Sequence, residues 1–281
     1  MKKIGVIDIG SNSVRLMLKD EQTQKFVRMT QLGKMKDGLL TCESVNASLQ
    51  AIKEFTGLAK GYKLYCFATE AVRSAKNGKE FCQKIKDEFN LVVDILTPSE
   101  EAKAGFLGAG GKESEVTVLD VGGASTEIIT GKNGNIEYAT SIPIGAVRLF
   151  DRCGEDLDSL KKTVLSLLSN SVPVSNKVVA IGGTATAIGA MLASPNSYDK
   201  EKVHGYSLTT QNIDNVIQKL VQLSIEERVK TYPVLPEKRA KVMVSGASVI
   251  KTFMDKYSIN SVTLSDSDNA EGYLILRKYE D

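Results

Sequence analysis

Residue types that often carry chemistry or cross membranes are scarce in this chain. Its 281 residues include no tryptophan, a single histidine and four cysteines. The cysteines form no C-x-x-C pair, which excludes a zinc cluster. No apolar run approaches the roughly 18 residues that span a bilayer, and the initial MKK leads straight into a strand-like run instead of the apolar core of a signal peptide. We therefore expect reduced thiols, no membrane partner and a cytoplasmic location.

An excess of charge of one sign is also missing. The 36 lysines and arginines nearly balance the 34 acidic residues, for a formal net charge of +2. Such a balance gives no bulk attraction to nucleic acid, so we expect no DNA partner. An anionic ligand must instead be held by local geometry. The composition, 42% hydrophobic and 25% charged, is that of a globular protein long enough for two domains.

The chain does contain one motif that is written twice. The two stretches are IGVIDIGSNSVRLML at residues 4–18 and VTVLDVGGASTEIIT at residues 116–130. Superimposing their aspartates also superimposes a glycine and a serine, which gives the pairs Asp8 and Asp120, Gly10 and Gly122, and Ser13 and Ser125. Aliphatic and β-branched runs flank a small polar turn in each copy, a pattern typical of strand, turn and strand. We therefore predict one structural unit that occurs twice.

The rest of the chain alternates between strand-like and helix-like patterns. Further strands are expected near residues 24–30, 62–68, 91–96, 177–181 and 261–264, and helices near 44–58, 81–89, 99–107, 144–151, 157–169 and 268–279. Ser99 is the expected N-cap of the helix at 99–107, and a long helix at 236–257 is expected to break only at Ser245-Gly246. This alternation predicts a mixed α/β architecture, with a domain boundary at the glycine-rich residues 108–111.

Three small-residue turns follow predicted strands and are candidate phosphate-binding loops. They comprise Gly10, Ser11, Asn12 and Ser13; Gly122, Gly123, Ala124 and Ser125; and Gly182, Gly183 and Thr184. Turns of this kind expose successive backbone N–H groups that can converge on phosphate oxygens. A single glycine-rich turn is more often a plain hairpin turn, whereas two matched turns preceded by aspartates are more specific. Asp8 and Asp120 are expected to face one another across a cleft, where a divalent metal bridging to phosphate would bind.

These turns belong to a longer series of motifs. In order along the chain they are DIGSNSVR at 8–15, ATEAVR at 68–73, EEA at 100–102, DVGGASTE at 120–127, PIGAVR at 143–148, GGTAT at 182–186 and VHGY at 203–206. With these motifs the chain resembles the exopolyphosphatase and guanosine pentaphosphate phosphohydrolase (Ppx/GppA) phosphatase family, within the superfamily of actin, sugar kinases and Hsp70 ATPase domains. The resemblance covers essentially the whole chain.

The resemblance implies a fold and a domain organisation. It implies two duplicated actin-like, ribonuclease H-like α/β lobes of the ATPase type with a cleft between them. We expect the first lobe at residues 1–111, which the C-terminal helix at 268–281 is a candidate to rejoin, and the second lobe at residues 112–267. No C-terminal helical extension like that of longer family members is expected. The expected oligomer is a homodimer.

The resemblance also implies an activity, which is exopolyphosphatase: hydrolysis of the terminal phosphoanhydride of inorganic polyphosphate. Glu101 would be the general base that activates a water, and Arg73 would bind phosphate oxygens with its planar fork. Asp120 and Glu127, together with Asp8, would hold Mg²⁺ or Mn²⁺, while the three turns supply N–H donors. From the residues alone, Glu101 reads as one of a solvated pair at a helix start and Arg73 as a surface arginine.

Other functions are also compatible with the sequence, and three positions depart from the family pattern. The same loops would suit guanosine pentaphosphate as substrate, a kinase that uses ATP, or a sensor that binds polyphosphate or an alarmone without turnover. Gln31 replaces a usual arginine, Ala124 replaces a usual third glycine, and residues 268–270 lack the usual glycine and arginine before Glu271. A methyl group at Ala124 requires a negative φ. These changes would weaken or redirect substrate binding.

Overall fold

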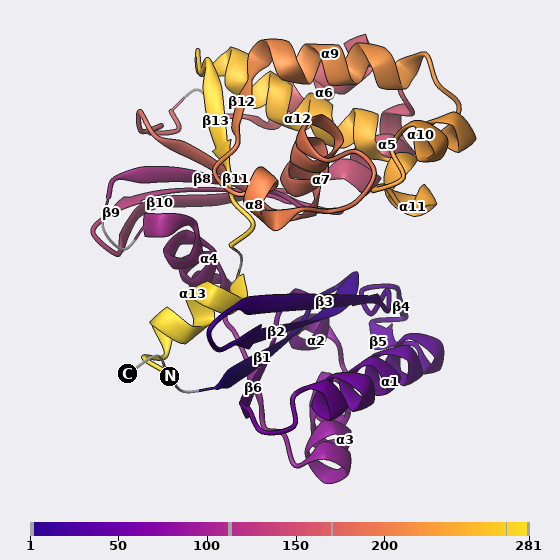
Figure 1. Cartoon of the computed structure of the whole chain (residues 1–281), viewed down its shortest axis with the longest axis vertical. Helices are drawn as coiled ribbons and strands as arrows, with labels where there is room; N and C mark the ends of the chain where they lie inside the picture. The colour runs from indigo at the N-terminus through magenta and orange to yellow at the C-terminus, as the bar shows by residue number, and fades with distance from the viewer. Residues whose placement is uncertain (1–2, 112–113, 170, 268, 280–281) are drawn as a thin grey trace. The chain divides into compact units, whose positions relative to one another are not determined.

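The computed structural model describes residues 3–111, 114–169, 171–267 and 269–279 of the chain (Figure 1). Contacts between residues divide the chain into two compact units, unit 1 (Met1–Glu101) and unit 2 (Ala102–Asp281). Each unit has its own sheet and its own hydrophobic core. No helix in the described ranges is long and apolar enough to cross a membrane.

A sheet forms the centre of unit 1. Among the described residues it has five strands in the order β3 (Thr23–Met29), β2 (Ser13–Lys19), β1 (Ile4–Ile9), β6 (Lys63–Ala68) and β7 (Val93–Ile95). β2 pairs antiparallel with β1 and β3, whereas β6 pairs parallel with β1 and β7. Between β3 and the first helix in the sequence, β4 (Met35–Lys36) and β5 (Leu39–Leu40) form a separate short hairpin. The strands predicted in this half of the chain are confirmed.

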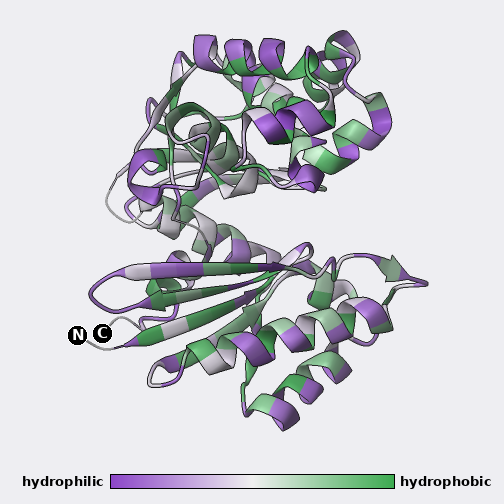
Figure 2. Cartoon of the chain, turned by 45° about the vertical axis from the view of Figure 1, so that its right-hand side comes forward, coloured by the Kyte–Doolittle hydropathy of each residue, from purple (hydrophilic) through white to green (hydrophobic). Residues whose placement is uncertain are grey.

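Helices complete the core of unit 1. They are α1 (Cys42–Leu58), α2 (Glu70–Ser74) and α3 (Gly78–Phe89). α1 begins at the cap Thr41, whose hydroxyl accepts the backbone N–H of Ser44. Phe55 of α1 and Ile85 of α3 are fully buried in one cluster with the central strands. Figure 2 shows this distribution: hydrophobic residues run along the strands, and hydrophobic and hydrophilic residues alternate along the helices.

The sheet of unit 2 repeats this arrangement and extends it. In the part of the chain that is described, its order is β10 (Asn135–Ile142), β9 (Thr126–Lys132), β8 (Val116–Val121), β11 (Val178–Ile181), β13 (Ser261–Leu264) and β12 (Ser207–Thr209). Two antiparallel pairs are again followed by parallel strands. The turn before β10 has positive φ at Asn133 (51°) and Gly134 (77°), as a tight hairpin requires. The predictions of a duplicated unit and a mixed α/β fold are confirmed.

Further helices follow along the chain. They are α4 (Pro98–Phe106), which begins in unit 1, the π-helical turn η1 (Leu107–Gly111), α5 (Ala146–Cys153), α6 (Leu157–Leu167), α7 (Gly182–Ala193), α8 (Lys200–Val203), α9 (Thr210–Val221), α10 (Ile225–Thr231), α11 (Glu237–Ala240), α12 (Met243–Lys256) and α13 (Asn269–Leu276). α12 contacts α5, α6, α7 and α9, so it is the central helix of this core. Nearby, the buried Arg228 donates to both carboxylate oxygens of Glu155, which offsets the cost of burying its charge.

The start of α4 differs from the prediction. The hydroxyl of Thr97 accepts the N–H of Glu100 at 3.3 Å, and the carboxylate of Glu100 accepts the N–H of Thr97 at 2.9 Å. This reciprocal pair is a capping box, and Pro98 occupies the first helical position, where its fixed φ is favourable. The prediction of Ser99 as the N-cap is therefore wrong, because the helix has already begun at Pro98.

The long helix predicted at 236–257 breaks at a different place. α11 ends at Ala240 and α12 begins at Met243, whereas Ser245-Gly246 lies inside α12. A Cβ on Gly246 would lie 2.7 Å from Thr184 Cγ2 and 3.1 Å from Ala146 Cβ. Gly246 therefore permits close helix packing and does not interrupt the helix.

Residues 108–111 lie in η1, which is kinked at Gly110, because this residue has a non-helical φ of 94°. A Cβ on Gly111 would lie 2.4 Å from the ring of Phe106, so this glycine is required by packing. α13 packs against the same turn, and a Cβ on Gly272 would lie 1.6 Å from Ala104 O. Glycine thus serves close contact here instead of chain flexibility.

Candidate active site

The two duplicated turns close with the same hydrogen bond. In loop 1 (residues 10–13) the N–H of Gly10 donates to Ser13 O at 3.0 Å, and in loop 2 (residues 122–125) the N–H of Gly122 donates to Ser125 O at 3.0 Å. A Cβ would approach that oxygen to 3.3 Å at Gly10 and to 3.2 Å at Gly122. The similarity predicted from the two sequences therefore extends to the backbone geometry.

A turn that follows β3 braces loop 1. The N–H groups of Thr30 and Gln31 both donate to Asn12 O at 3.0 Å, and the N–H of Gly33 donates to Ser11 O at 2.7 Å. Gln31 makes this contact with its backbone, at a φ of 54°. The brace therefore does not depend on the side chain that departs from the family pattern.

The start of α5 braces loop 2. Its first three N–H groups donate to the carbonyl oxygens of Gly122 (2.9 Å) and Gly123 (2.9 and 3.1 Å). The fit is close, because a Cβ on Gly145 would lie 2.4 Å from Gly122 O and 2.8 Å from Ala124 N. Ala124 itself is not among the residues with positive φ, so its methyl group is accommodated without backbone strain.

Bracing the carbonyl groups leaves backbone donors available in both loops. The N–H groups of Ser11 and Asn12 in loop 1, and of Gly123 and Ala124 in loop 2, have no acceptor among the described residues. All four residues are at least partly exposed. Pairs of successive N–H groups in small-residue turns form concave sites for anions. Each loop can therefore accept a phosphate group.

The third turn, loop 3 (residues 182–184), is joined to the end of β8. Gly182 has a φ of 83°, and a Cβ there would lie 2.2 Å from Asp120 Oδ1. Thr184 Oγ1 donates to Val121 O at 2.8 Å. Loop 3 also opens α7, which has no side-chain cap on its first N–H groups. Unit 2 thus brings together loop 2, loop 3 and Asp120.

The predicted carboxylates of unit 2 are cross-strand neighbours. Asp120 on β8 lies directly opposite Glu127 on β9, and such pairs point to the same face of the sheet. Glu127 Oε1 also accepts the hydroxyl of Ser141 at 2.7 Å. Although the described residues contain no cluster of three metal-ligating side chains, Mg²⁺ is usually held by one or two carboxylates plus substrate phosphates. The pair therefore fits a divalent cation.

The equivalent pair in unit 1 has a different charge. Asp8, which is 7% exposed, lies opposite Arg15. The arginine of β2 thus stands where β9 has Glu127. Because a guanidinium repels a cation, this pair is less suited to a metal than the pair in unit 2.

The predicted catalytic residues meet in unit 1. Arg73 of α2 donates from Nη1 to Glu101 Oε2 of α4 at 3.1 Å and to Leu96 O. The two side chains are 25% and 30% exposed, so a ligand can reach them. Nε and Nη2 of Arg73 have no acceptor in the described ranges. That edge of the guanidinium is a planar fork that can bind two phosphate oxygens.

α2 also connects this ion pair to loop 1. Ser11 Oγ donates to Glu70 Oε2 at 3.4 Å, one turn before Arg73. Ser74 donates to the carboxylate and the carbonyl oxygen of the same Glu70. Helix α2 therefore carries both the carboxylate that contacts loop 1 and the arginine that pairs with Glu101.

The structure adds Arg239, which the sequence analysis missed. A Cβ on Gly183 would lie 3.0 Å from Arg239 Nη2, so the guanidinium lies against loop 3. Arg239 belongs to the short helix α11 and is part of none of the recognised motifs. Only the packing of α11 in unit 2 reveals this basic group. Of the departure at residues 268–270, residue 268 lies outside the described residues.

Comparison with known proteins identifies the family. A sequence model described as the Ppx/GppA phosphatase family matches residues 6–278. The chain belongs to this family. Membership confirms the predicted resemblance and the prediction that the chain is a phosphoanhydride hydrolase of this phosphatase class.

Individual Ppx/GppA relatives are similar over nearly the whole chain. Exopolyphosphatase 2 of Mycobacterium tuberculosis is 25% identical, over 97% of this chain and 97% of its own length. A bifunctional 3-dehydroquinate synthase/phosphatase of Fusobacterium nucleatum is 26% identical over 96% of this chain, which spans 46% of that longer protein.

Solved structures of Ppx/GppA proteins have the same fold. The family member from Aquifex aeolicus is 30% identical with a TM-score of 0.81, covering 99% of this chain and 98% of its own. An exopolyphosphatase from Cytophaga hutchinsonii is 25% identical with a TM-score of 0.84, again covering 99% and 98%. The predicted fold class is confirmed by these likenesses.

Proposed function

We propose that this protein is an exopolyphosphatase that removes the terminal phosphate from inorganic polyphosphate. The observation that carries the proposal is the matched pair of loops, each with two backbone N–H groups that have no acceptor among the described residues. Each loop can accept one phosphate group, and a polyphosphate chain offers many such groups. The M. tuberculosis relative that matches over nearly its full length is named an exopolyphosphatase.

Arg73 and Glu101 supply the reactive part of the proposal. The fork of Arg73 binds oxygens of the terminal phosphoryl group, and the same side chain holds the carboxylate of Glu101 in place. Glu101 accepts a proton from a water whose oxygen forms the new bond to phosphorus. The phosphoanhydride bond breaks, and the shortened chain leaves with the bonding electron pair. Positioning and neutralisation of charge supply most of the rate in such reactions.

Asp120 and Glu127 of unit 2 would hold Mg²⁺ or Mn²⁺ in this proposal, whereas Asp8 of unit 1, which lies opposite Arg15, is the weaker candidate ligand. When bound, the ion would neutralise negative charge on the phosphate chain. Loop 3 and Arg239 provide N–H donors and a positive charge beside Asp120. A cytoplasmic location and a homodimer belong to the same proposal, on the ground of family membership.

The test is phosphate release by the purified protein with Mg²⁺, with polyphosphate of short and long chains, guanosine pentaphosphate and ATP offered in parallel. Glu101→Gln should lower kcat on polyphosphate by about 10² to 10⁴ fold, the usual contribution of a general base. Glu100→Gln is the matched control, because Glu100 caps α4 and is not part of the Arg73 pair. It should lose stability and keep most of its kcat.

Other substrates and roles are separate outcomes of this experiment. Faster turnover of guanosine pentaphosphate than of polyphosphate would assign the alarmone as the substrate of the same site. Phosphoryl transfer from ATP to an acceptor would assign a kinase. Retained binding of polyphosphate with no phosphate release from any substrate would make the protein a sensor and overturn the hydrolase proposal.

A further inference from the structure

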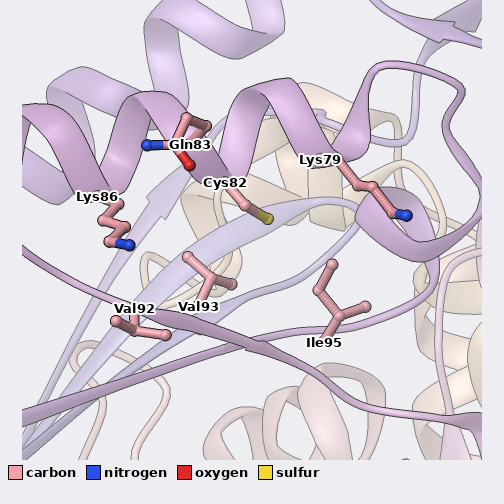
Figure 3. A pocket seen from close by; sticks show the side chains of 7 residues that line it. All are labelled: Lys79, Cys82, Gln83, Lys86, Val92, Val93 and Ile95. Atoms are coloured by element: carbon pink, nitrogen blue, oxygen red, sulfur yellow. The ribbon is translucent and has the colours of Figure 1, made fainter.

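A groove runs between α3 and the outer edge of β7 in unit 1 (Figure 3). Lys79, Cys82, Gln83 and Lys86 line it from α3, and Val92, Val93 and Ile95 line it from the strand side. The helical residues share one face, since they are three or four positions apart. Figure 3 shows the valines and Ile95 below the helix, with the two lysines at opposite ends of the helical wall. None of these residues belongs to the active-site network.

β7 offers unpaired backbone groups to this groove. It is the terminal strand of its sheet in the described chain and pairs only with β6. The N–H of Leu96 donates toward β6, to Ala68 O. Because backbone groups alternate in direction along a strand, the N–H and C=O groups of Val93 and Ile95 point away from β6, toward the free edge.

One apolar side chain beside this edge is highly exposed, whereas Val93 and Ile95 are partly buried against the core. Val92 is 73% exposed, the largest exposed fraction among the large apolar residues described. Natural edge strands are protected by short length, charged side chains or proline; β7, with the sequence Val-Asp-Ile, is short and carries one charge but no lysine or proline. Its Asp94 points to the opposite face from Val93 and Ile95. The edge is therefore able to accept another strand.

The groove is positively charged. Lys79 and Lys86 are exposed and form no ion pair with any described residue, and no acidic side chain lines the groove. The lysines are seven positions apart, which is about 10 Å along a helix and corresponds to about three residues of an extended strand. Since side chains on one face of a strand are two positions apart, the charges match an extended segment with acidic residues at alternate positions.

We propose that the groove between α3 and β7 binds an extended acidic segment of a partner protein, which pairs with β7 as an added strand. Backbone hydrogen bonds to Val93 and Ile95 would contribute affinity whatever the sequence of the bound segment. A central apolar side chain would cover Val92, and flanking glutamates or aspartates would pair with Lys79 and Lys86. This docking site does not depend on the proposed phosphatase activity.

The first test measures binding of a fluorescein-labelled peptide, acetyl-Glu-Val-Glu-Val-Glu-amide, to the full chain by fluorescence anisotropy. Saturable binding at or below about 1 mM is expected, and it should weaken as salt rises. The double variant Lys79→Glu/Lys86→Glu should bind about tenfold more weakly, because two exposed ion pairs become repulsions. Lys53→Glu/Lys60→Glu, on and just after α1, is the matched control with the same change in net charge and should bind normally.

Two further measurements separate strand addition from mere attraction of charge. A peptide with N-methyl groups on alternate residues cannot donate to β7 and should bind at least tenfold more weakly, although its charge is unchanged. Bound peptide should also protect Cys82 from alkylation. Burial raises the pKa of the Cys82 thiol to about 11, so this labelling is done at alkaline pH, with the exposed Cys42 as internal standard.

Several results would overturn the proposal. Binding that is equal for the N-methylated peptide, or equal for the Lys79/Lys86 and Lys53/Lys60 variants, would show that the peptide does not occupy the groove as a strand. No saturation up to about 1 mM would exclude the site for this chemistry. A change of oligomeric state in Lys79→Glu/Lys86→Glu without peptide would instead assign the groove to a second copy of the chain.

Discussion

Loop 1 and loop 2 have the same backbone geometry, but the side chains beside them differ in charge. Both close with a glycine N–H to serine C=O hydrogen bond of 3.0 Å, and both have their carbonyl groups held by a later segment. The residue opposite the preceding aspartate is Arg15 in unit 1 and Glu127 in unit 2. Duplication therefore kept the geometry that presents N–H groups, while the neighbouring side chains diverged.

The difference suggests a division of labour between the loops. A turn with an arginine beside it attracts phosphate by charge as well as by N–H groups. A turn with two carboxylates beside it repels phosphate unless a cation lies between them. We therefore expect loop 2 to bind phosphate with the metal and loop 1 to bind it directly.

The largest difference between the two loops should come from the two residues that differ in charge. Glu127→Gln should raise the Mg²⁺ concentration for half-maximal activity by about 10- to 100-fold, the usual cost of weakening a metal site. Arg15→Gln should raise KM for polyphosphate and leave the Mg²⁺ requirement unchanged. The Mg²⁺ concentration for half-maximal activity is measured for both variants by magnesium titration at saturating substrate. An equal shift in the two titrations would contradict the division of labour.

The two braces should differ in their tolerance of an added methyl group. In Gly145→Ala the Cβ would meet backbone, 2.4 Å from Gly122 O, so loop 2 must move. We expect a loss of about 2 kcal/mol in the free energy of unfolding, as for an overpacked core, and about a tenfold rise in KM. In Gly33→Ala the nearest atom to the new Cβ is Ser11 Cβ at 3.0 Å. The loss in the free energy of unfolding and the rise in KM should therefore both be smaller than in Gly145→Ala.

Chemical denaturation and steady-state kinetics measure these two effects. Ser141→Ala is a control near loop 2, since it removes a hydroxyl from Glu127 without crowding the loop. It should leave KM for polyphosphate nearly unchanged. A larger loss for Gly33→Ala than for Gly145→Ala would reverse the expected order of the two braces.

The smallest effect is expected at Ala124. Its φ is not positive, so a glycine there is not needed for the conformation of loop 2. Ala124→Gly should change kcat and KM by less than about twofold and should lower the free energy of unfolding by about 0.4–1 kcal/mol, through the greater freedom of the unfolded chain. A marked gain in activity would show instead that the methyl group obstructs phosphate.

Much of the fold could be predicted because it is encoded locally. The runs of aliphatic residues in β1, β2, β8 and β9, and the glycines and serines between them, specify strands and tight turns within a few residues. Errors occurred where a glycine served packing. Gly246 reads as a chain break, yet it lies inside α12, where Thr184 leaves no room for a Cβ.

The sequence by itself determined the duplicated α/β unit, the two small-residue loops and the aspartates before them, since each depends on residues that are adjacent in the chain. Only the tertiary structure decided that Arg73 meets Glu101, that α5 braces loop 2, that Arg239 lies against Gly183 and that Lys79 and Lys86 flank an open strand edge. These contacts join residues that are distant in sequence or lie on different elements. They depend on how helices pack on the sheets, and no local pattern of residue types specifies that packing.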